Sequence, residues 1–177
     1  MTSVKKILIT SALSAVLLGF SSIVSAHEMA SDTPSVASKC DEITTKIDKR
    51  VELFNTNKTT HEERYKTVST RISNLITKLD DKGYDTSKLK TAFEGLTALI
   101  TKFNQDYTVF IDSIVMLKHF PCGNSQGGFL EQLRVAHSDL KIVRQDTVDI
   151  RNYYKDNVRP ALQELRDQKP KQTTPSQ

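Results

Sequence analysis

The residues of this chain whose chemistry is easiest to recognise are four histidines and two cysteines. No two histidines have the H-x-x-x-H or H-E-x-x-H spacing that places two metal ligands on one face of a helix. The sequence also has no G-x-S-x-G nucleophile motif, Walker loop or dinucleotide-binding glycine pattern. From these residues we expect no catalytic activity, no cofactor and no metal centre.

His27 leaves one alternative open. If the chain is cleaved after Ala26, the new terminal amine and the His27 imidazole can chelate copper together. The other histidines (His61, His119 and His137) show no ligand spacing. Copper binding is therefore a minor hypothesis, which a copper titration of the mature protein tests.

The two cysteines, Cys40 and Cys122, lie on either side of a predicted turn. The midpoint between them is residue 81, and the turn signal is at Lys82–Asp85. In a helical hairpin folded at that turn, the two cysteines meet at its open end. The absence of a C-x-x-C motif argues against a redox-active pair. We predict a structural disulfide that closes a loop of about 80 residues and contributes roughly 4 kcal/mol.

The first 26 residues have the pattern of an export signal. Lys5 and Lys6 precede the apolar stretch Ile7–Phe20, and Val24–Ala26 provides a cleavage site. We therefore predict a signal peptide over residues 1–26 and a periplasmic or extracellular location, where disulfides form readily. The alternative is an uncleaved anchor that tethers the protein to a membrane.

Cleavage changes the charge of the chain. It removes two of the 25 basic residues and none of the 21 acidic ones. The mature chain is then close to neutral, which leaves little support for nucleic-acid binding. It also keeps no apolar segment long enough for stable membrane insertion.

The rest of the chain has a helical period in three stretches. Stripe positions recur in alternating steps of four and three residues, which keeps them on one side of a helix. In the first stretch they are Ile47, Val51, Phe54, Lys58, His61, Tyr65, Val68, Ile72, Leu75 and Leu79. In the second they are Leu89, Phe93, Leu96, Ile100, Phe103, Tyr107, Phe110, Ile114 and Leu117. In the third they are Leu133, Ala136, Leu140, Val143, Thr147, Ile150 and Tyr154.

Capping and breaking residues predict where these helices begin and end. A capping box predicts a start at Ser38, after a flexible lead-in over residues 27–37. Gly83 ends the first helix and Pro121 the second, the third starts near Gly128, and Pro160 predicts a kink or an end. Residues 168–177 form a polar tail that we expect to be disordered.

Together these signals predict an all-α protein. The predicted fold is an elongated up-down-up three-helix antiparallel coiled-coil bundle over residues 38–167, with a disulfide closing the first hairpin. The second helix carries further apolar residues outside its stripe, which are Leu99, Val109, Ile111, Val115 and Met116. Contact with two neighbouring helices explains such a wide face, and docking of a client or a second copy is the alternative.

Charges are sorted by face on the first and third helices. On the first, Arg50, Arg64, Arg71 and Lys78 recur at multiples of seven on one flank of the stripe. On the third, basic residues gather in one arc and acidic residues in another. The basic arc includes Arg144, Arg151, Lys155 and Arg159. It is either a solvated surface or a binding face for an anionic partner such as a cell-surface polymer or lipid headgroups.

The chain resembles small exported all-helical bacterial proteins of unknown function. The resemblance rests on the cysteine that opens the first helix and on three short motifs: K-G-Y-D at Lys82–Asp85, P-C-G at Pro121–Gly123 and R-N-Y-Y…V-R-P at Arg151–Pro160. It implies a fold and a compartment, and it transfers no activity. The signal, size and basic residues are also similar to those of periplasmic helical chaperones, but the L-T-x-x-Q motif of one such family is absent.

Two functional hypotheses follow. The first is an exported structural or interaction module without catalytic activity, whose partner is a protein or another component of the cell envelope. The second is a periplasmic chaperone-like or ligand-binding protein that uses the apolar face of the second helix. Either one allows a homo-oligomer.

Overall fold

The computed structural model describes residues 36–120 and 127–168, with side chains from residue 39 onward. All of them belong to one compact unit, Pro34–Gln177. Every regular element in these ranges is helical, which confirms the all-α class. In chain order the elements are α1 (Val36–Asp80), α2 (Ser87–Met116), the 3-10 turn η1 (Leu117–His119), α3 (Gly128–Tyr153), the π-helical turn η2 (Tyr154–Val158) and α4 (Arg159–Asp167).

Several predictions concern other parts of the chain. The signal peptide, most of the lead-in and the tail beyond Gln168 lie outside the described residues, as does Cys122. None of the described helices combines the length and the apolarity needed to cross a membrane.

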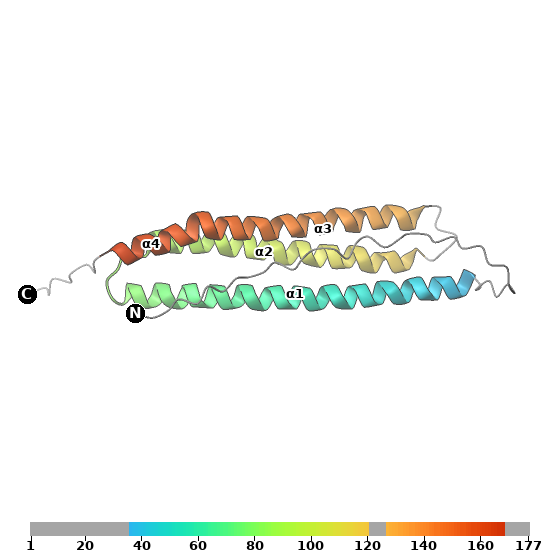
Figure 1. The fold of residues 1–177 in the computed structure, drawn as a ribbon, viewed down its shortest axis with the longest axis horizontal. Helices are drawn as coiled ribbons and strands as arrows, with labels where there is room; N and C mark the ends of the chain where they lie inside the picture. The colour runs from blue at the N-terminus through green and yellow to red at the C-terminus, as the bar shows by residue number, and fades with distance from the viewer. Residues whose placement is uncertain (1–35, 121–126, 169–177) are drawn as a thin grey trace, which may run out of the picture. The chain divides into compact units, whose positions relative to one another are not determined.

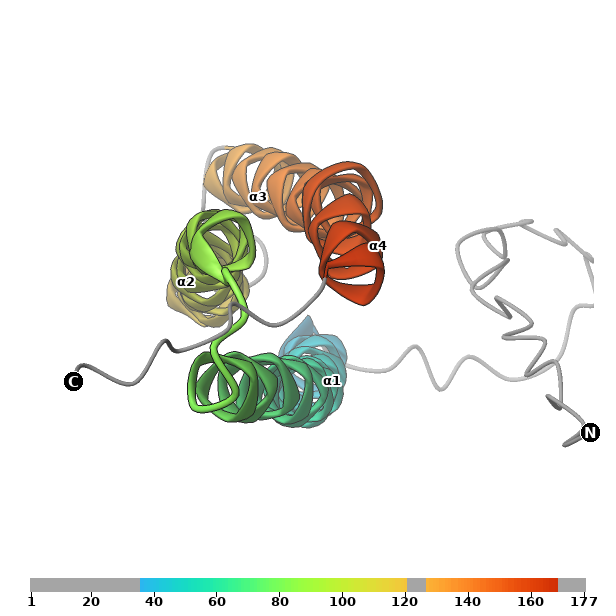
Figure 2. The ribbon, with the colours of Figure 1, turned by 90° about the vertical axis from the view of Figure 1, so that its left-hand side faces the viewer.

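Helix α2 lies beside both α1 and α3 (Figures 1 and 2). Residue numbers rise along α2 as they fall along each neighbour, so α2 is antiparallel to both. Three contacts show this for α1: Asp48 with Lys118, Phe54 with Phe110, and Tyr65 with Phe103. Three more show it for α3 and α4: Ser113 with Asp139, Lys102 with Asp146, and Lys88 with Glu164.

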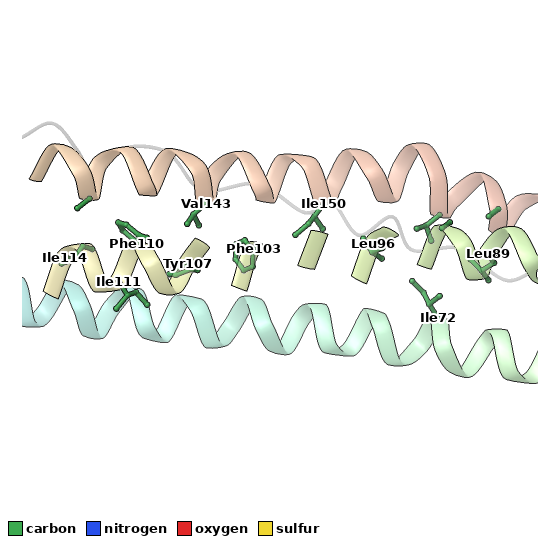
Figure 3. Close-up of a cluster of buried hydrophobic side chains, with 14 of the residues drawn as sticks. Ile72, Leu89, Leu96, Phe103, Tyr107, Phe110, Ile111, Ile114, Val143 and Ile150 are labelled. Carbon is green, nitrogen blue, oxygen red and sulfur yellow. The ribbon is translucent and has the colours of Figure 1, made fainter. Parts of the chain in front are cut away.

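The core is built on the stripe of α2 (Figure 3). The residues of this stripe that are buried are Leu89, Leu96, Phe103, Tyr107, Phe110, Ile114 and Leu117. Phe103 packs edge-on against Tyr65 at 5.3 Å between ring centroids, and Phe110 packs edge-on against Phe54 at 4.8 Å. The heptad read from the sequence therefore places the apolar residues of α2 correctly.

The predicted turn between α1 and α2 is confirmed at Gly83, whose φ of 76° is left-handed. At the start of α2, Asp85 Oδ1 accepts a hydrogen bond from the backbone N–H of Ser87 at 3.1 Å. The Thr86 side chain caps no backbone group and instead donates to Asp80, which also pairs with Lys90 at 2.7 Å. Gln168 closes this end of the bundle, because its side-chain amide bonds the backbone N–H and C=O of Asp85.

Two predictions for α1 are corrected. The helix begins at Val36, so Ser38 lies inside it and is not its cap. The stripe also shifts near its end: Ile76 is buried, whereas Val68 and Leu75 are each 37% exposed. A straight α-helix drifts by about 20° per heptad against a strict seven-residue repeat, so a long stripe rotates off its seam.

The third predicted helix is interrupted before Pro160. The π-helical turn η2 separates α3 from α4, and Pro160 lies in the first turn of α4. Proline has no N–H for the i−4 carbonyl and its ring crowds that carbonyl, so the widened turn accommodates it. Within this turn the expected register fails, because Tyr154 is 39% exposed and Val158 is fully buried.

Candidate interaction surface

Three acidic residues of α3 and α4 contact α2: Asp139, Asp146 and Glu164. Asp139 accepts a hydrogen bond from the Ser113 hydroxyl. Glu164 pairs with Lys88 at 2.7 Å. Asp146, described next, is the third of these acids, whereas Glu131 and Asp156 remain exposed.

Asp146 is at the centre of a polar cluster in the α2–α3 interface. Its side chain is only 4% exposed, and Lys102 Nζ lies 2.5 Å from its Oδ1 and 2.6 Å from Asp106 Oδ2. Burial raises the pKa of Asp146, whereas the hydrogen bond from Lys102 lowers the pKa of Asp106. The same two carboxylates raise the pKa of Lys102. The cluster therefore holds one ammonium group between two acids of unequal strength.

This cluster is not evident from the sequence, because charged residues on an amphipathic helix are usually solvated. One signal was available: Asp146 lies three residues after Val143 and four before Ile150, both of them buried stripe positions. A carboxylate at that position has to face the bundle.

The basic row predicted on the third helix is exposed. Arg144 and Arg151 lie on α3, Lys155 on η2 and Arg159 on α4. Among the described residues, no ion pair involves any of the three arginines, and Lys155 approaches only its neighbour Asp156, at 3.9 Å. Asp139, Asp146 and Glu164 contact α2 and do not pair with the row.

The basic flank of α1 is exposed as well. It consists of Arg50, Arg64, Arg71 and Lys78, and none of them forms an ion pair within the described part of the chain. Next to it, His61 is half-buried and packs edge-on against Phe103 at 5.5 Å. Burial, and secondly the charge of Arg64, lowers the pKa of His61.

The extra apolar residues of α2 are mostly covered. Ile111 is buried, and Leu99 and Val115 are half-buried against the core. Only Val109 and Met116 stay exposed, at 52% and 45%. Contact with two neighbouring helices thus accounts for most of this wide face.

One shallow groove of about 440 Å³ lies where α2 passes η2 and α4. Tyr153 and Pro160 form part of its wall, and the Lys88–Glu164 pair lies at its edge. The groove is open to solvent, and the charged groups that line it are paired.

The other predicted site residues are not brought together. Cys40 is half-buried in the second turn of α1, and its predicted partner Cys122 is outside the described ranges. His119 and His137 are exposed, and His27 is also outside those ranges. Within the part of the chain that the structure describes, no group of three His, Cys, Asp or Glu side chains could hold a metal ion.

Comparison of this chain with protein-family models, with curated proteins and with solved structures found no match.

Proposed function

We propose that this protein is an exported, non-catalytic interaction module that presents a basic helix face to an anionic partner in the cell envelope. The observation that carries the proposal is the division of charge on α3 and α4. Asp139, Asp146 and Glu164 are engaged by α2, whereas Arg144, Arg151 and Arg159 point to solvent without an ion pair among the described residues.

This division of charge favours an anionic partner, because unpaired, aligned cations attract an extended anion. Over the 15 residues from Arg144 to Arg159, the row is about 22 Å long at 1.5 Å per residue. The mature chain is close to neutral, so the attraction comes from this local row and not from net charge.

The proposal includes the up-down-up coiled-coil bundle and the Cys40–Cys122 disulfide. Support for the disulfide comes from the pairing of Lys118 with Asp48. In the sequence, Asp48 is eight residues after Cys40 and Lys118 is four residues before Cys122, so this ion pair lies near both ends of the proposed disulfide. Such a staple fixes α1 against α2 and keeps the surface rigid.

A charge-neutralising variant tests the proposed function. R144Q/R151Q/R159Q removes three charges from the row, and K66Q/K82Q/K88Q removes three exposed charges outside the basic arc. We expect the wild type to be retained on immobilised polyphosphate, and the row variant to elute at no more than half the wild-type salt concentration. The control variant should elute close to the wild type, because exposed charges far from the contact are screened. Equal elution of the two variants would contradict the proposal.

The chaperone-like alternative has weaker support. It needs a broad apolar surface on α2, and only Val109 and Met116 of the extra residues remain exposed. Dye binding by the wild type, abolished in V109S/M116S, would favour it.

A further inference from the structure

The two basic rows lie on the same side of the bundle. Asp48 and Asp80 of α1 pair with α2, and Arg64 lies about 160° around the helix from both of them. On α3, Arg144 and Arg151 lie about 140–160° around the helix from Asp146, which pairs with Lys102 of α2. Each row therefore lies on a flank of its helix, on the side away from these ion pairs with α2.

Tyr65 and Thr147 mark the line along which α1 faces α3. The Tyr65 hydroxyl interacts with Thr147, and the charge of Arg64 acts on Tyr65. Arg144 and Arg151 lie within about 60° of Thr147 around α3. Both helices are antiparallel to α2 and so run in the same direction, which places the two rows along opposite borders of one seam.

This seam is loosely closed. No described Cα atom of α1 lies within 8 Å of one in α3, although α2 makes such contacts with both helices. Directly packed helices have axes about 8–10 Å apart, which normally brings some Cα atoms closer than that. Figure 2 shows α1 and α3 each beside α2, with the α1–α3 side opposite it. Like charges on both borders disfavour closer approach.

Exposed apolar residues lie among these cations. Val148 is 46% exposed and follows Arg144 by four residues and precedes Arg151 by three. Leu133 is 45% exposed and precedes Arg144 by eleven residues, or about three turns, so it lies on the same side of α3. On α1, Val68 and Leu75 are each 37% exposed and follow Arg64 and Arg71 by one turn. We call these four residues and the eight cations of the two rows the α1–α3 face.

We propose that the α1–α3 face binds the surface of an anionic lipid bilayer. This inference rests on the proposed function and names the partner. A soluble polyanion gains only from the cations, whereas the boundary between lipid headgroups and acyl chains also accommodates exposed valine and leucine side chains. The combination of both kinds of residue on one face is what favours lipid. The protein lies on the bilayer and does not cross it.

Vesicle co-sedimentation tests the inference, and it suits a chain that has no tryptophan for fluorescence. The full chain is mixed with phosphatidylcholine vesicles that contain or lack phosphatidylglycerol. Every variant carries the same N-terminal segment, so differences among variants report the face alone. We expect tighter binding to the anionic than to the neutral vesicles, with R64Q/R71Q/R144Q/R151Q raising the anionic lipid concentration for half-binding at least tenfold.

A second variant separates lipid from a soluble polyanion. V68S/L75S/V148S should weaken vesicle binding at least threefold and leave retention on polyphosphate unchanged. Its matched control, V109S/M116S/I142S, changes three exposed apolar residues elsewhere and should shift half-binding less than twofold. Circular dichroism of each variant checks that the helices are intact.

The two proposals fail in different ways. The lipid assignment is overturned if the protein is retained on polyphosphate but does not bind anionic vesicles. It is also overturned if V68S/L75S/V148S leaves vesicle binding unchanged. Either result leaves the proposed binding of an anionic partner intact. If the cation variants keep both polyphosphate retention and vesicle binding, both proposals are overturned.

Discussion

Asp146 is a buried carboxylate in the α2–α3 interface, so its ionisation affects the stability of the fold. Burial raises its pKa, so its folded-state pKa lies above the unfolded value. A group of this kind stabilises the protein fully below the unfolded pKa, and the contribution is lost as pH rises through the folded pKa. Asp106 behaves in the opposite way, because the hydrogen bond from Lys102 lowers its pKa and its contribution is lost as pH falls.

The D146N and D106N variants should therefore show opposite pH trends. Relative to wild type, D146N should gain stability as pH rises from about 3.5 to 7, because the amide has no proton to lose. D106N should lose stability over the same range, because it lacks the carboxylate that pairs with Lys102. Urea unfolding at a series of pH values measures both differences. Parallel curves for the two variants would contradict the assignment of opposite shifts.

At the scale of single elements, the sequence predicted where the apolar residues lie but not how the helices deform. The stripe of α2 is correct throughout because aromatic and branched residues fill it without a polar break. In α1 the rule fails at Val68 and Leu75, because a seven-residue repeat does not follow a straight helix of this length. Pro160 indicates a disturbance, but the sequence alone does not specify that a π-helical turn absorbs it.

The close approach of α2 and α3 at Gly95 is another such detail. A Cβ atom at this position would overlap the Tyr153 hydroxyl and lie 2.6 Å from its Cζ. We expect G95A to destabilise the protein by about 1–2 kcal/mol, because the crowding outweighs the better helix propensity of alanine. In a Y153A background the same change should stabilise it by up to about 1 kcal/mol. Thermal unfolding of the four proteins in this cycle measures the coupling. Equal effects of G95A in both backgrounds would show that Tyr153 does not crowd the glycine.

At the scale of the whole molecule, the sequence predicted the two basic rows but not that they lie on the same side of the bundle. Heptad spacing placed Arg64 and Arg71 on one flank of their helix, and the row from Arg144 to Arg159 on one arc of another. Whether two such rows meet depends on which helix lies between them, and that is a property of the packed bundle. The contacts of α2 with both neighbours, and the acids they engage, are what leave the two rows on one side.

A rigid face of this kind depends on the hairpin that carries α1, so the predicted disulfide is a test at this scale. We expect the unreduced, denatured protein to resist alkylation at Cys40 and Cys122, and mass spectrometry measures this directly. Reduction should lower the melting temperature by about 5–15 °C, since a loop of roughly 80 residues is worth about 4 kcal/mol on the chain-entropy model. The C40S/C122S variant should melt like the reduced wild type and should not respond to reductant. Two alkylated cysteines in the unreduced protein would rule out the disulfide, and α1 would then be held against α2 only by the packing and ion pairs that the structure describes.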